Sequence, residues 1–309
     1  MKLSIVIPNY NGENNLRNNI PKLIEVVREY REDLEVIITD DASSDNSPQV
    51  IKNLVNNTRD IKIIPLFNEK NLGFASNVNR GVSRASGEII ILLNTDVIPH
   101  AGFLEPLLNH FSDEKVFAVG CVDESVEDEK IILRGRGIGE WKRGLLVHSR
   151  GEISKSDTLW VSGGSGAFRK SLWVMLGGFD TLYDPFYWED IDLSYRARKM
   201  GFFTLFENKS IVRHEHEKGI IKNKFSKNEV KRIAFRNQFF FVWKNADISN
   251  LASHIIWLPY HILKGITSGE IMLIFGLLTA LIRIPVIIQS RLKVRKFFIK
   301  KDSEVIITK

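Results

Sequence analysis

The fold is decided by residues 34–57, which read LEVIITDDASSDNSPQVIKNLVNN. The β-branched run Leu34–Thr39 is typical of a buried strand, and two aspartates follow it. Residues 47–57 are predicted to form a helix, because Ser47 suits its start and Pro48 suits its first turn. A strand, a polar turn and a helix in this order are the repeating unit of α/β proteins.

The same unit recurs on both sides of this stretch. Strands are predicted at residues 3–7, 61–66 and 88–93, and helices at 16–27 and 73–85. We therefore expect a mainly parallel sheet with helices on both faces, whose strand ends meet at one ligand crevice. Beyond this region the pattern loosens. There we expect strands at 116–121, 159–168 and 211–214, a helix at 190–200, loops or a hairpin at 123–151, and only helices after 225.

Composition excludes disordered and fibrous proteins, because 44% of the 309 residues are hydrophobic and 26% are charged. Cys121 is the single cysteine, so this chain forms no intrachain disulfide and no cysteine-based zinc cluster. The first apolar run, Leu3–Ile7, is too short for a signal peptide. These features predict a cytoplasmic protein.

Four polar clusters follow predicted strands or open a predicted helix: Asp40–Asp45, Asn94–Asp96, Trp188–Asp192 and His214–His216. Carboxylates at strand ends can bond a nucleobase or ribose, and with substrate phosphates they suit Mg²⁺ or Mn²⁺. Each cluster alone also has an ordinary structural explanation. Asp and Ser favour turns, acids favour helix N-termini, and a histidine can close a surface loop.

Seven motifs occur in order along the chain: SIVIPNYN at 4–11, TDDASSD at 39–45, NLGFA at 71–75, LNTDV at 93–97, GGFD at 177–180, EDIDL at 189–193 and VRH at 212–214. With them, residues 2 to about 245 resemble the family 2 glycosyltransferases, in particular the bacterial rhamnosyltransferase-like branch. The resemblance implies the GT-A nucleotide-diphospho-sugar transferase fold, a Rossmann-like α/β fold. Its catalytic domain would cover residues 1–224, with a nucleotide-binding half at about 1–98 and an acceptor-binding half at about 99–224, before a C-terminal helical appendage at 225–309.

The resemblance also implies roles for individual residues. Asp190 matches the general base, and Asp96 and His214 match ligands of Mg²⁺ or Mn²⁺, with His216 close enough to be the alternative ligand. The family's usual metal triplet is D-x-D, and Asn94 replaces its first aspartate here. Donor contacts are implied for Pro8, Tyr10, Asn11, Asp40, Asn71, Gly73, Asn94 and Thr95, and acceptor contacts for Gly164, Trp188 and Glu189. Within the donor set, Pro8 and Tyr10 would line the nucleobase pocket and Asp40 would bond the base.

The implied reaction is an inverting transfer from a nucleotide-diphosphate sugar to a hydroxyl of a glycan or lipid-linked glycan in cell-surface polysaccharide synthesis. Metal charge offsets the charge on the leaving diphosphate, and Asp190 acts as base. Transfer to a polyprenyl phosphate is one alternative. A sugar-nucleotide nucleotidyltransferase would need a Gly- and Arg-rich loop after the first strand, and a non-catalytic binding protein would not need all of Asp40, Asp96 and Asp190. Arg196, four residues after Asp192, is predicted to form a helical ion pair with it.

The net charge is −5 over residues 1–218 and +11 over residues 219–309. Residues 271–282 are uncharged, but twelve residues are fewer than the roughly 20 that span a bilayer. We expect a helix lying at the membrane interface, peripheral on the inner face, flanked by Arg291, Lys293, Arg295, Lys296, Lys300 and Lys301. A single-pass helix, and a helix packed on the catalytic domain or on a homodimer partner, are the alternatives. Nucleic acid is excluded, because the basic residues flank apolar segments. We also expect removal of residues 268–309 to leave the nucleotide site folded.

Overall fold

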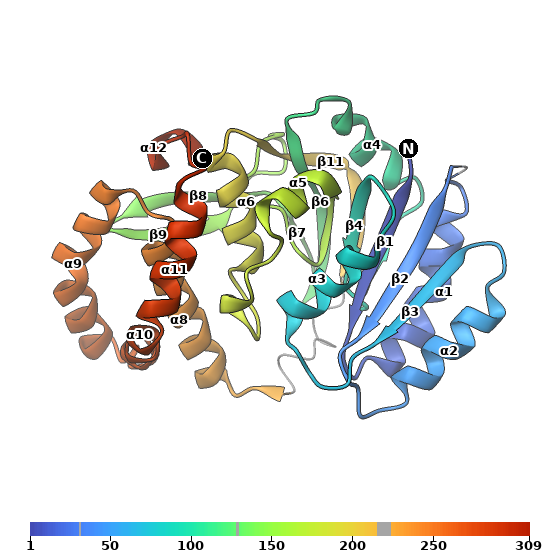
Figure 1. The fold of residues 1–309 in the computed structure, drawn as a ribbon, viewed down its shortest axis with the longest axis horizontal. Coiled ribbons are helices and arrows are strands. Elements are labelled where there is room, and N and C mark those ends of the chain that lie inside the picture. The colour runs from blue at the N-terminus through green and yellow to red at the C-terminus, as the bar shows by residue number, and fades with distance from the viewer. Residues whose placement is uncertain (31, 128–129, 215–223) are drawn as a thin grey trace.

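The computed structural model describes residues 1–30, 32–127, 130–214 and 224–309 of the chain (Figure 1). Within them, nine strands form one mixed sheet in the order β3-β2-β1-β4-β10-β6-β11-β5, with β7 paired to β6. The first four strands run parallel: β1 (Leu3–Asn9), β2 (Leu34–Asp40), β3 (Lys62–Phe67) and β4 (Ile89–Leu93). They are connected by α1 (Glu13–Val27), α2 (Ser47–Asn57) and α3 (Phe74–Arg84). The alternation of strands and helices along the chain is the predicted one.

Helices cover both faces of this sheet because successive side chains of a strand point to opposite sides. Ile5 and Ile7 of β1 are fully buried in a core that includes side chains of α1 and α2. Val6, between them, is fully buried in a second core with side chains of α3. The sheet therefore has a core on each face, and its strand ends are left for the site.

The second half of the sheet contains β5 (Val97–Pro99), β6 (Val116–Glu127), β7 (Lys130–Arg134), β10 (Ser165–Arg169) and β11 (Phe203–His214). A separate hairpin is formed by β8 (Gly137–Lys142) and β9 (Leu145–Arg150). The helices here are α4 (Leu104–Asn109), α5 (Lys170–Leu176) and α6 (Glu189–Lys199), with short 3-10 helices η1 (His110–Ser112) and η2 (Thr181–Tyr183). β10 is antiparallel to both of its neighbours.

Three segments differ from the sequence-based expectation. Residues 123–151 contain the hairpin β8–β9, one of the two predicted possibilities, and also form β7 and the end of β6, which were not predicted. In place of the predicted strand 159–168, the strand β10 begins at Ser165 and ends at Arg169. The residues before it form a glycine-containing loop that turns toward the site. β11 is much longer than predicted, since an irregularity between Glu207 and Ile211 breaks its alternation of polar and apolar residues.

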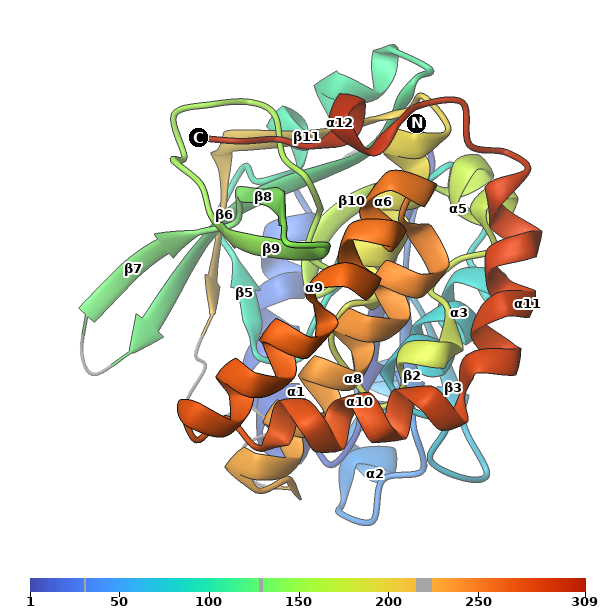
Figure 2. The same cartoon turned by 90° about the vertical axis from the view of Figure 1, so that its left-hand side faces the viewer.

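The C-terminal region contains α8 (Lys227–Asn245), α9 (Ile248–Thr267), α10 (Met272–Ile282), α11 (Ile284–Arg295) and α12 (Asp302–Val305). A third core joins it to the sheet-containing part of the chain: Phe239–Val242 of α8 pack with Trp188, with Tyr195 of α6 and with Leu146 of β9. Figure 2 shows α9, α10 and α11 as an outer layer around α8. No single helix of the described part of the chain is long and apolar enough to cross a bilayer, although α10 and α11, bent by 72°, pass that test of length and composition as a pair.

The last residues return to the sheet-containing part of the chain. The backbone N–H of Gly139 donates to the Ile307 carbonyl at 2.8 Å. Asp302 is 2% exposed and lies 2.8 Å from Lys199 Nζ, whose side chain is fully buried. Removing residues 268–309 would leave that ammonium with one of its two carboxylates. We therefore revise the expectation that this truncation leaves the nucleotide site intact, and expect it to destabilise the fold.

The substitution Asp302→Ala should lower the free energy of unfolding by about 3–5 kcal/mol, because it uncouples a buried charge from its partner. Asp302 also accepts hydrogen bonds from Tyr195 and Asn250. Urea unfolding of the full chain measures the loss. Asp60→Ala breaks an ion pair with Arg28 in which both side chains are about half exposed, and it serves as control. Equal stability of the two variants would contradict the assignment.

Candidate active site

Asp40, at the end of β2, is held in one orientation. Its side chain is 1% exposed. Asn9 Nδ2 and Ser43 Oγ donate to Oδ1 at 2.7 and 2.6 Å, and the Ser43 N–H donates to Oδ2 at 3.0 Å. Asn11, with φ of 48°, accepts from the Ser44 N–H at 2.7 Å and donates its own N–H to Ser43 Oγ at 2.8 Å. The loops after β1 and β2 are therefore tied together at one edge of the sheet.

A hollow of about 490 Å³ opens beside this loop pair, lined by Asp40, Ala42, Ser43, Pro48, Lys52, Phe67 and Asn68. Lys52 Nζ lies 5.9 Å from the centre of the Phe67 ring. An aromatic side chain, a cation and polar groups together suit a flat heterocycle. Pro8 is buried within β1, and Tyr10 is half-buried with Lys224 Nζ 4.2 Å from its ring centre.

Asp41 secures the loop that precedes α3. Its Oδ1 accepts from the Leu72 N–H at 2.8 Å, and its Oδ2 accepts from the Gly73 N–H at 3.0 Å. Asn71 Nδ2 donates to the Asp41 carbonyl at 3.3 Å. Gly73 has φ of +92°, and a Cβ there would lie 2.7 Å from the Asp184 carboxylate, so a side chain is excluded. Asn71 and Gly73, expected to contact the donor, both hold this loop.

The turn after β4 contacts the loop that precedes β10. The Asn94 N–H donates to the Gly164 carbonyl at 2.9 Å, and the Gly163 N–H donates to Asp190 Oδ2 at 3.3 Å. Thr95, 5% exposed, accepts at its carbonyl from Asn19 Nδ2 at 2.9 Å. Two consecutive glycines thus connect the Asn94–Asp96 turn to Asp190, and the two motifs lie in one crevice.

Asp190 lies in the first turn of α6. Its carboxylate also accepts from the Ile191 N–H at 2.8 Å. Burial raises the pKa of Asp190, although the hydrogen bonds from Ile191 and Gly163 oppose the shift. Tyr187 and Trp188, directly before the helix, have φ of 70° and 79°, which places backbone strain beside the carboxylate. A half-buried carboxylate with a raised pKa is suited to accept a proton.

Glu189 differs from its neighbour. Its side chain is 6% exposed, and its Oε2 has no hydrogen-bond partner among the described residues. Burial, and then the charge of Asp190, raise the pKa of Glu189 well above its usual value. Adjacent carboxyl groups with unequal environments separate into an acid and a base. Burial therefore favours the neutral form of Glu189 more strongly than the neutral form of Asp190.

His214, at the end of β11, lies between two carboxylates. Its Nε2 is 3.3 Å from Asp96 Oδ2 and its Nδ1 is 3.0 Å from Asp123 Oδ2. Burial lowers the pKa of His214, but Asp123 and Asp96 outweigh burial and raise that pKa to about 9. The structure therefore brings Asp96 and His214 together, as the sequence predicted, and adds Asp123 from β6.

An aspartate oxygen and an imidazole nitrogen fit a divalent cation that takes its other ligands from substrate phosphates, as Mg²⁺ and Mn²⁺ commonly do. Asp96 and His214, 15% and 13% exposed, are the side chains that would hold it. Within residues 1–30, 32–127, 130–214 and 224–309, no group of three His, Cys, Asp or Glu side chains is arranged to hold a metal by itself. The alternative ligand His216 lies outside the described residues.

The aromatic side chains beside Asp190 divide into a buried one and an exposed one. Trp188 is 5% exposed and packs with its ring centre 5.1 Å from those of both His148 and Phe241. Tyr187 is 43% exposed. Trp188, expected to contact the acceptor, therefore lies in the core beneath the site, and Tyr187 offers the open aromatic surface.

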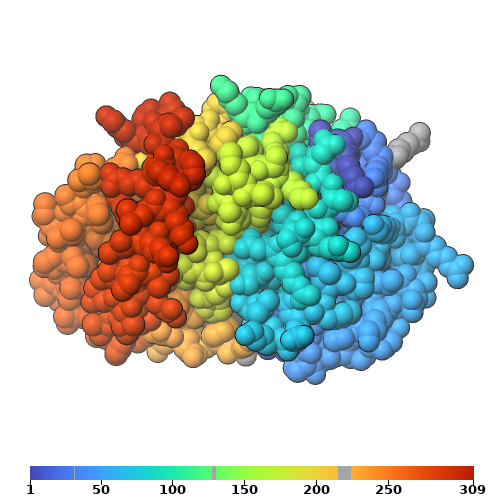
Figure 3. Space-filling model, in the orientation of Figure 1, coloured from blue at the N-terminus to red at the C-terminus, as the bar shows by residue number. Residues whose placement is uncertain are grey.

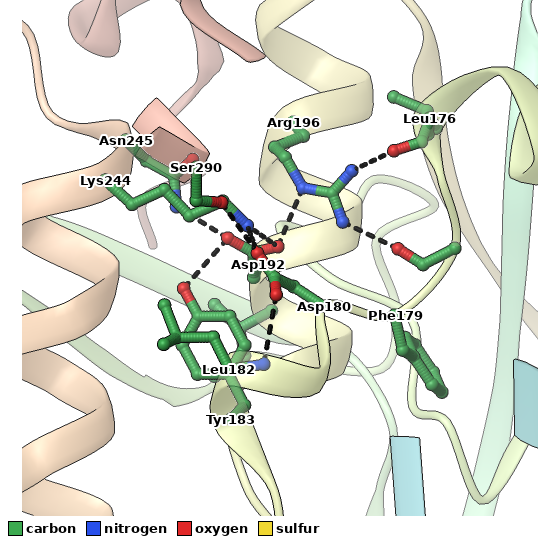
Figure 4. A network of polar contacts seen from close by, with 12 residues as sticks. Leu176, Phe179, Asp180, Leu182, Tyr183, Asp192, Arg196, Lys244, Asn245 and Ser290 are labelled. Atoms are coloured by element: carbon green, nitrogen blue, oxygen red, sulfur yellow. Dashed lines mark hydrogen bonds and ion pairs between the residues drawn. The ribbon is translucent and has the colours of Figure 1, made fainter. Parts of the chain in front are cut away.

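Asp192, two residues further along α6, is the centre of a buried network (Figure 4). Arg196 Nε and Lys244 Nζ lie 2.7 and 2.9 Å from its Oδ2, and the Tyr183 hydroxyl donates to its Oδ1 at 2.9 Å. Burial raises the pKa of Asp192, but Arg196 and Lys244 outweigh burial and lower it. The predicted helical pair between Asp192 and Arg196 is confirmed. Lys244 comes from α8, so the network joins the site helix to the C-terminal helices.

Sequence reasoning missed three residues of this region. Asp123 follows an apolar strand as Asp40 and Asp96 do, and that signal could have identified it. Lys52 lies on the second turn of α2, and its position toward the hollow depends on packing that the sequence does not show. Lys244 was missed because its contact with Asp192 also depends on packing that the sequence does not show.

Comparisons with known proteins identify the family and the fold of the chain. The family model described as glycosyl transferase family 2 matches residues 4–175. A pre-mycofactocin glycosyltransferase of Mycobacterium tuberculosis is 29% identical over 222 residues, covering 69% of this chain and 43% of that protein. An undecaprenyl-phosphate 4-deoxy-4-formamido-L-arabinose transferase of Proteus mirabilis is 32% identical over 96 residues, covering 31% of this chain and 29% of that protein. The chain spans less than half the length of these curated relatives.

Two solved structures share the fold at low sequence identity. GalNAc-T7 with UDP, GalNAc and Mn²⁺ has a TM-score of 0.64 at 18% identity, covering 87% of this chain and 57% of that one. A mannosyltransferase of Pyrobaculum calidifontis in complex with GDP-Man and Mn²⁺ has a TM-score of 0.60 at 15% identity, covering 91% and 87%. The expected GT-A fold is thereby confirmed. Since the family model matches more than half of the sequence, this chain belongs to glycosyl transferase family 2.

Proposed function

We propose that the protein is an inverting, metal-dependent glycosyltransferase that moves a sugar from a nucleotide-diphosphate sugar to a hydroxyl of a glycan or lipid-linked glycan in cell-surface polysaccharide synthesis. The observation that carries the proposal is the link from Asp190 through Gly163 and Gly164 to the Asn94–Asp96 turn. It puts a carboxylate of raised pKa beside the residues that face the donor diphosphate. The rhamnosyltransferase-like branch stays a prediction, as do the sugar and the base.

The donor half of the crevice binds and orients. The nucleobase enters the hollow beside Asp40, where Ser43 and Lys52 offer polar contacts. A divalent metal, when bound, supplies positive charge to the leaving diphosphate. Asp96 and His214 are the side chains that would hold it, and Asn94 belongs to the same turn as Asp96.

The acceptor half supplies the base. Asp190 takes the proton of the acceptor hydroxyl while the hydroxyl oxygen forms a bond to the anomeric carbon. At the same time the bond from that carbon to the diphosphate oxygen breaks. The N–H groups of Gly163 and Ile191 hold the carboxylate in place while it accepts the proton. Attack opposite the leaving group inverts the anomeric carbon.

The alternative acceptor is a polyprenyl phosphate, the substrate class named for the relative from Proteus mirabilis. A phosphate oxygen is already ionised near neutral pH and needs no base. A carboxylate whose pKa is raised by burial and which is held by the Gly163 and Ile191 N–H groups is suited to removing a proton, so Asp190 favours a hydroxyl acceptor. We place the reaction at the inner face of the cell membrane, the location predicted from the sequence.

Asp190→Asn should lower turnover by about 10²–10⁴-fold and keep donor affinity, because only the basic oxygen is lost. Asp60→Asn, which makes the same substitution in an exposed ion pair with Arg28, is the matched control and should keep the turnover of the parent. Transfer assays at saturating donor measure both. Parental turnover in Asp190→Asn would place the base elsewhere or indicate a phosphate acceptor.

The acid limb of the parental rate profile tests the same assignment. Because burial raises the pKa of Asp190, the base is protonated at pH values where an exposed aspartate, with a pKa of about 3.9, is still ionised. Turnover should therefore fall as pH decreases through this raised pKa. A profile without an acid limb above about pH 4 would contradict a buried base.

Asp96→Ala should remove the dependence of donor affinity on metal while leaving the fold intact, since Asp96 is a partly exposed turn residue. A thermal-shift panel of nucleotide sugars with and without Mn²⁺ measures this. In the parent, donor at about 100 times its Kd adds about 2.7 kcal/mol of stability. The same gain from Mn²⁺ in both proteins would exclude Asp96 as ligand.

Gly164→Ala should cost about 10²-fold in turnover by displacing the loop that holds Asp190. A Cβ at Gly164 would lie 2.5 Å from Asn94 Nδ2. Gly120→Ala, in β6, is the control, because its Cβ would be 3.8 Å from its nearest neighbours. Turnover and thermal unfolding are measured for both variants. Unchanged turnover in Gly164→Ala would show that this loop does not position the base.

A further inference from the structure

The exposed face of α9 is apolar along its whole length. Its stripe consists of Ile248, Ala252, Ile255, Ile256, Pro259, Leu263 and Ile266, all of them exposed. At about 100° per residue, these positions fall within an arc of about 100°. Ile256 is 73% exposed and Leu263 is 62% exposed. A helix on a water-facing surface normally carries polar residues on that side.

α10 repeats the pattern. Gly276, Leu277 and Ala280 are buried, and a Cβ on Gly276 would be 2.8 Å from Phe235 of α8. The residues that remain exposed at helical spacing are Ile271, Phe275, Leu278 and Ile282. Ile282 is 79% exposed. α10 is thus apolar on both its packed and its open sides, and it lies beside α9 in the outer layer (Figure 2).

Basic residues accompany this surface. Residues 248–301 contain eight Lys or Arg and one acid, Glu270. That acid is paired with Lys231 of α8 at 2.6 Å. Lys264, Arg283, Lys293, Arg295 and Lys296 are exposed. Apolar side chains bordered by positive charge complement a surface that is itself apolar and bordered by negative charge.

Two aromatic side chains of α9, Trp257 and Tyr260, lie outside the stripe, on the side of the helix that contacts the turn between β8 and β9. The Arg143 guanidinium, from the turn between β8 and β9, lies 4.9 Å from the Trp257 ring centre and 4.2 Å from that of Tyr260. Trp257 is 39% exposed. Tryptophan, tyrosine and arginine with one apolar and one polar end are typical of the headgroup level of a bilayer.

We propose that the exposed faces of α9 and α10 form a platform that binds an anionic lipid bilayer. The platform consists of the seven apolar residues given above for α9 and the four given for α10. A second copy of the chain is the competing occupant. The exposed Lys264 of α9 and Arg283 at the end of α10 would be brought toward their own copies in a symmetric dimer built on this face, whereas anionic headgroups neutralise them. The inference specifies the proposed membrane location, and it does not depend on which sugar is transferred.

The test is flotation of the purified full chain with vesicles of phosphatidylcholine alone and of phosphatidylcholine with about one quarter phosphatidylglycerol. The parent should float with the anionic vesicles, and less so at high salt, because screening weakens the basic contribution. The double variant Ile256→Glu with Leu263→Glu should bind these vesicles at least about tenfold more weakly than the parent, because two exposed apolar side chains are replaced by negative charges.

The matched control is Ile131→Glu with Leu133→Glu, which makes the same substitutions at side chains of β7 that are 59% and 42% exposed. It should float like the parent. Thermal unfolding checks that both variants are folded, and light scattering gives the mass of the parent.

Three outcomes would overturn the platform. They are a parent that does not float with anionic vesicles at low salt, equal loss of binding in the two double variants, and a parental dimer that the helix variant dissociates without any vesicle binding. Because flotation needs neither donor nor acceptor, a failure here leaves the proposed reaction standing, and an inactive enzyme leaves the platform standing.

Discussion

The buried carboxylate of Asp192 is the interaction on which the rest of the structure depends. It is fully buried and has Arg196 and Lys244 within 3 Å, while Asn245 donates to it at 2.7 Å. A buried charge is tolerable only when its partners are complete, and loss of one partner typically costs about 3–5 kcal/mol. Asp190 lies two residues before Asp192 on the same helix. The position of the proposed base is therefore fixed by an ion network that lies outside the proposed reaction.

The same network makes the sheet-containing part of the chain and the C-terminal helices one body. Lys244 also pairs with Asp180, and Ser290 of α11 donates to that carboxylate at 2.8 Å. In Figure 3 the surface of α11, in red, lies against the yellow-green surface of the α5 region. A groove of about 460 Å³ between them is lined by residues of both. Short contacts between charged and polar groups thus join α8 and α11 to α6 and to the loop before it.

The sequence predicted what depends on local pattern. The strand and helix at 34–57, the strand-end positions of Asp40 and Asp96, and the pair Asp192–Arg196 all follow from residue spacing. Lys244 did not, because a lysine after an aromatic run in a helix looks solvent-exposed, and its two carboxylate partners come from residues 180 and 192. Asp302 likewise gains its burial from Lys199, which is distant in sequence. The partners of buried charges were missed because the helical pattern places a residue on a face but does not show what packs against that face.

The uneven distribution of charge would orient the protein on an anionic surface. The body up to residue 218 carries −5 and the remainder carries +11, so the charges form a dipole along the chain's own division into site and outer helices. An anionic surface attracts the basic end and repels the acidic end over about 10 Å at moderate salt. Because α8 and α6 are joined through Asp192, orienting the outer helices also orients α6 and the crevice at its start. A bilayer bound by α9 and α10 would therefore hold the crevice in one orientation relative to its lipid-linked acceptors. The apolar stripe would bind the membrane, and the buried ion network would keep α6 in a fixed position relative to it.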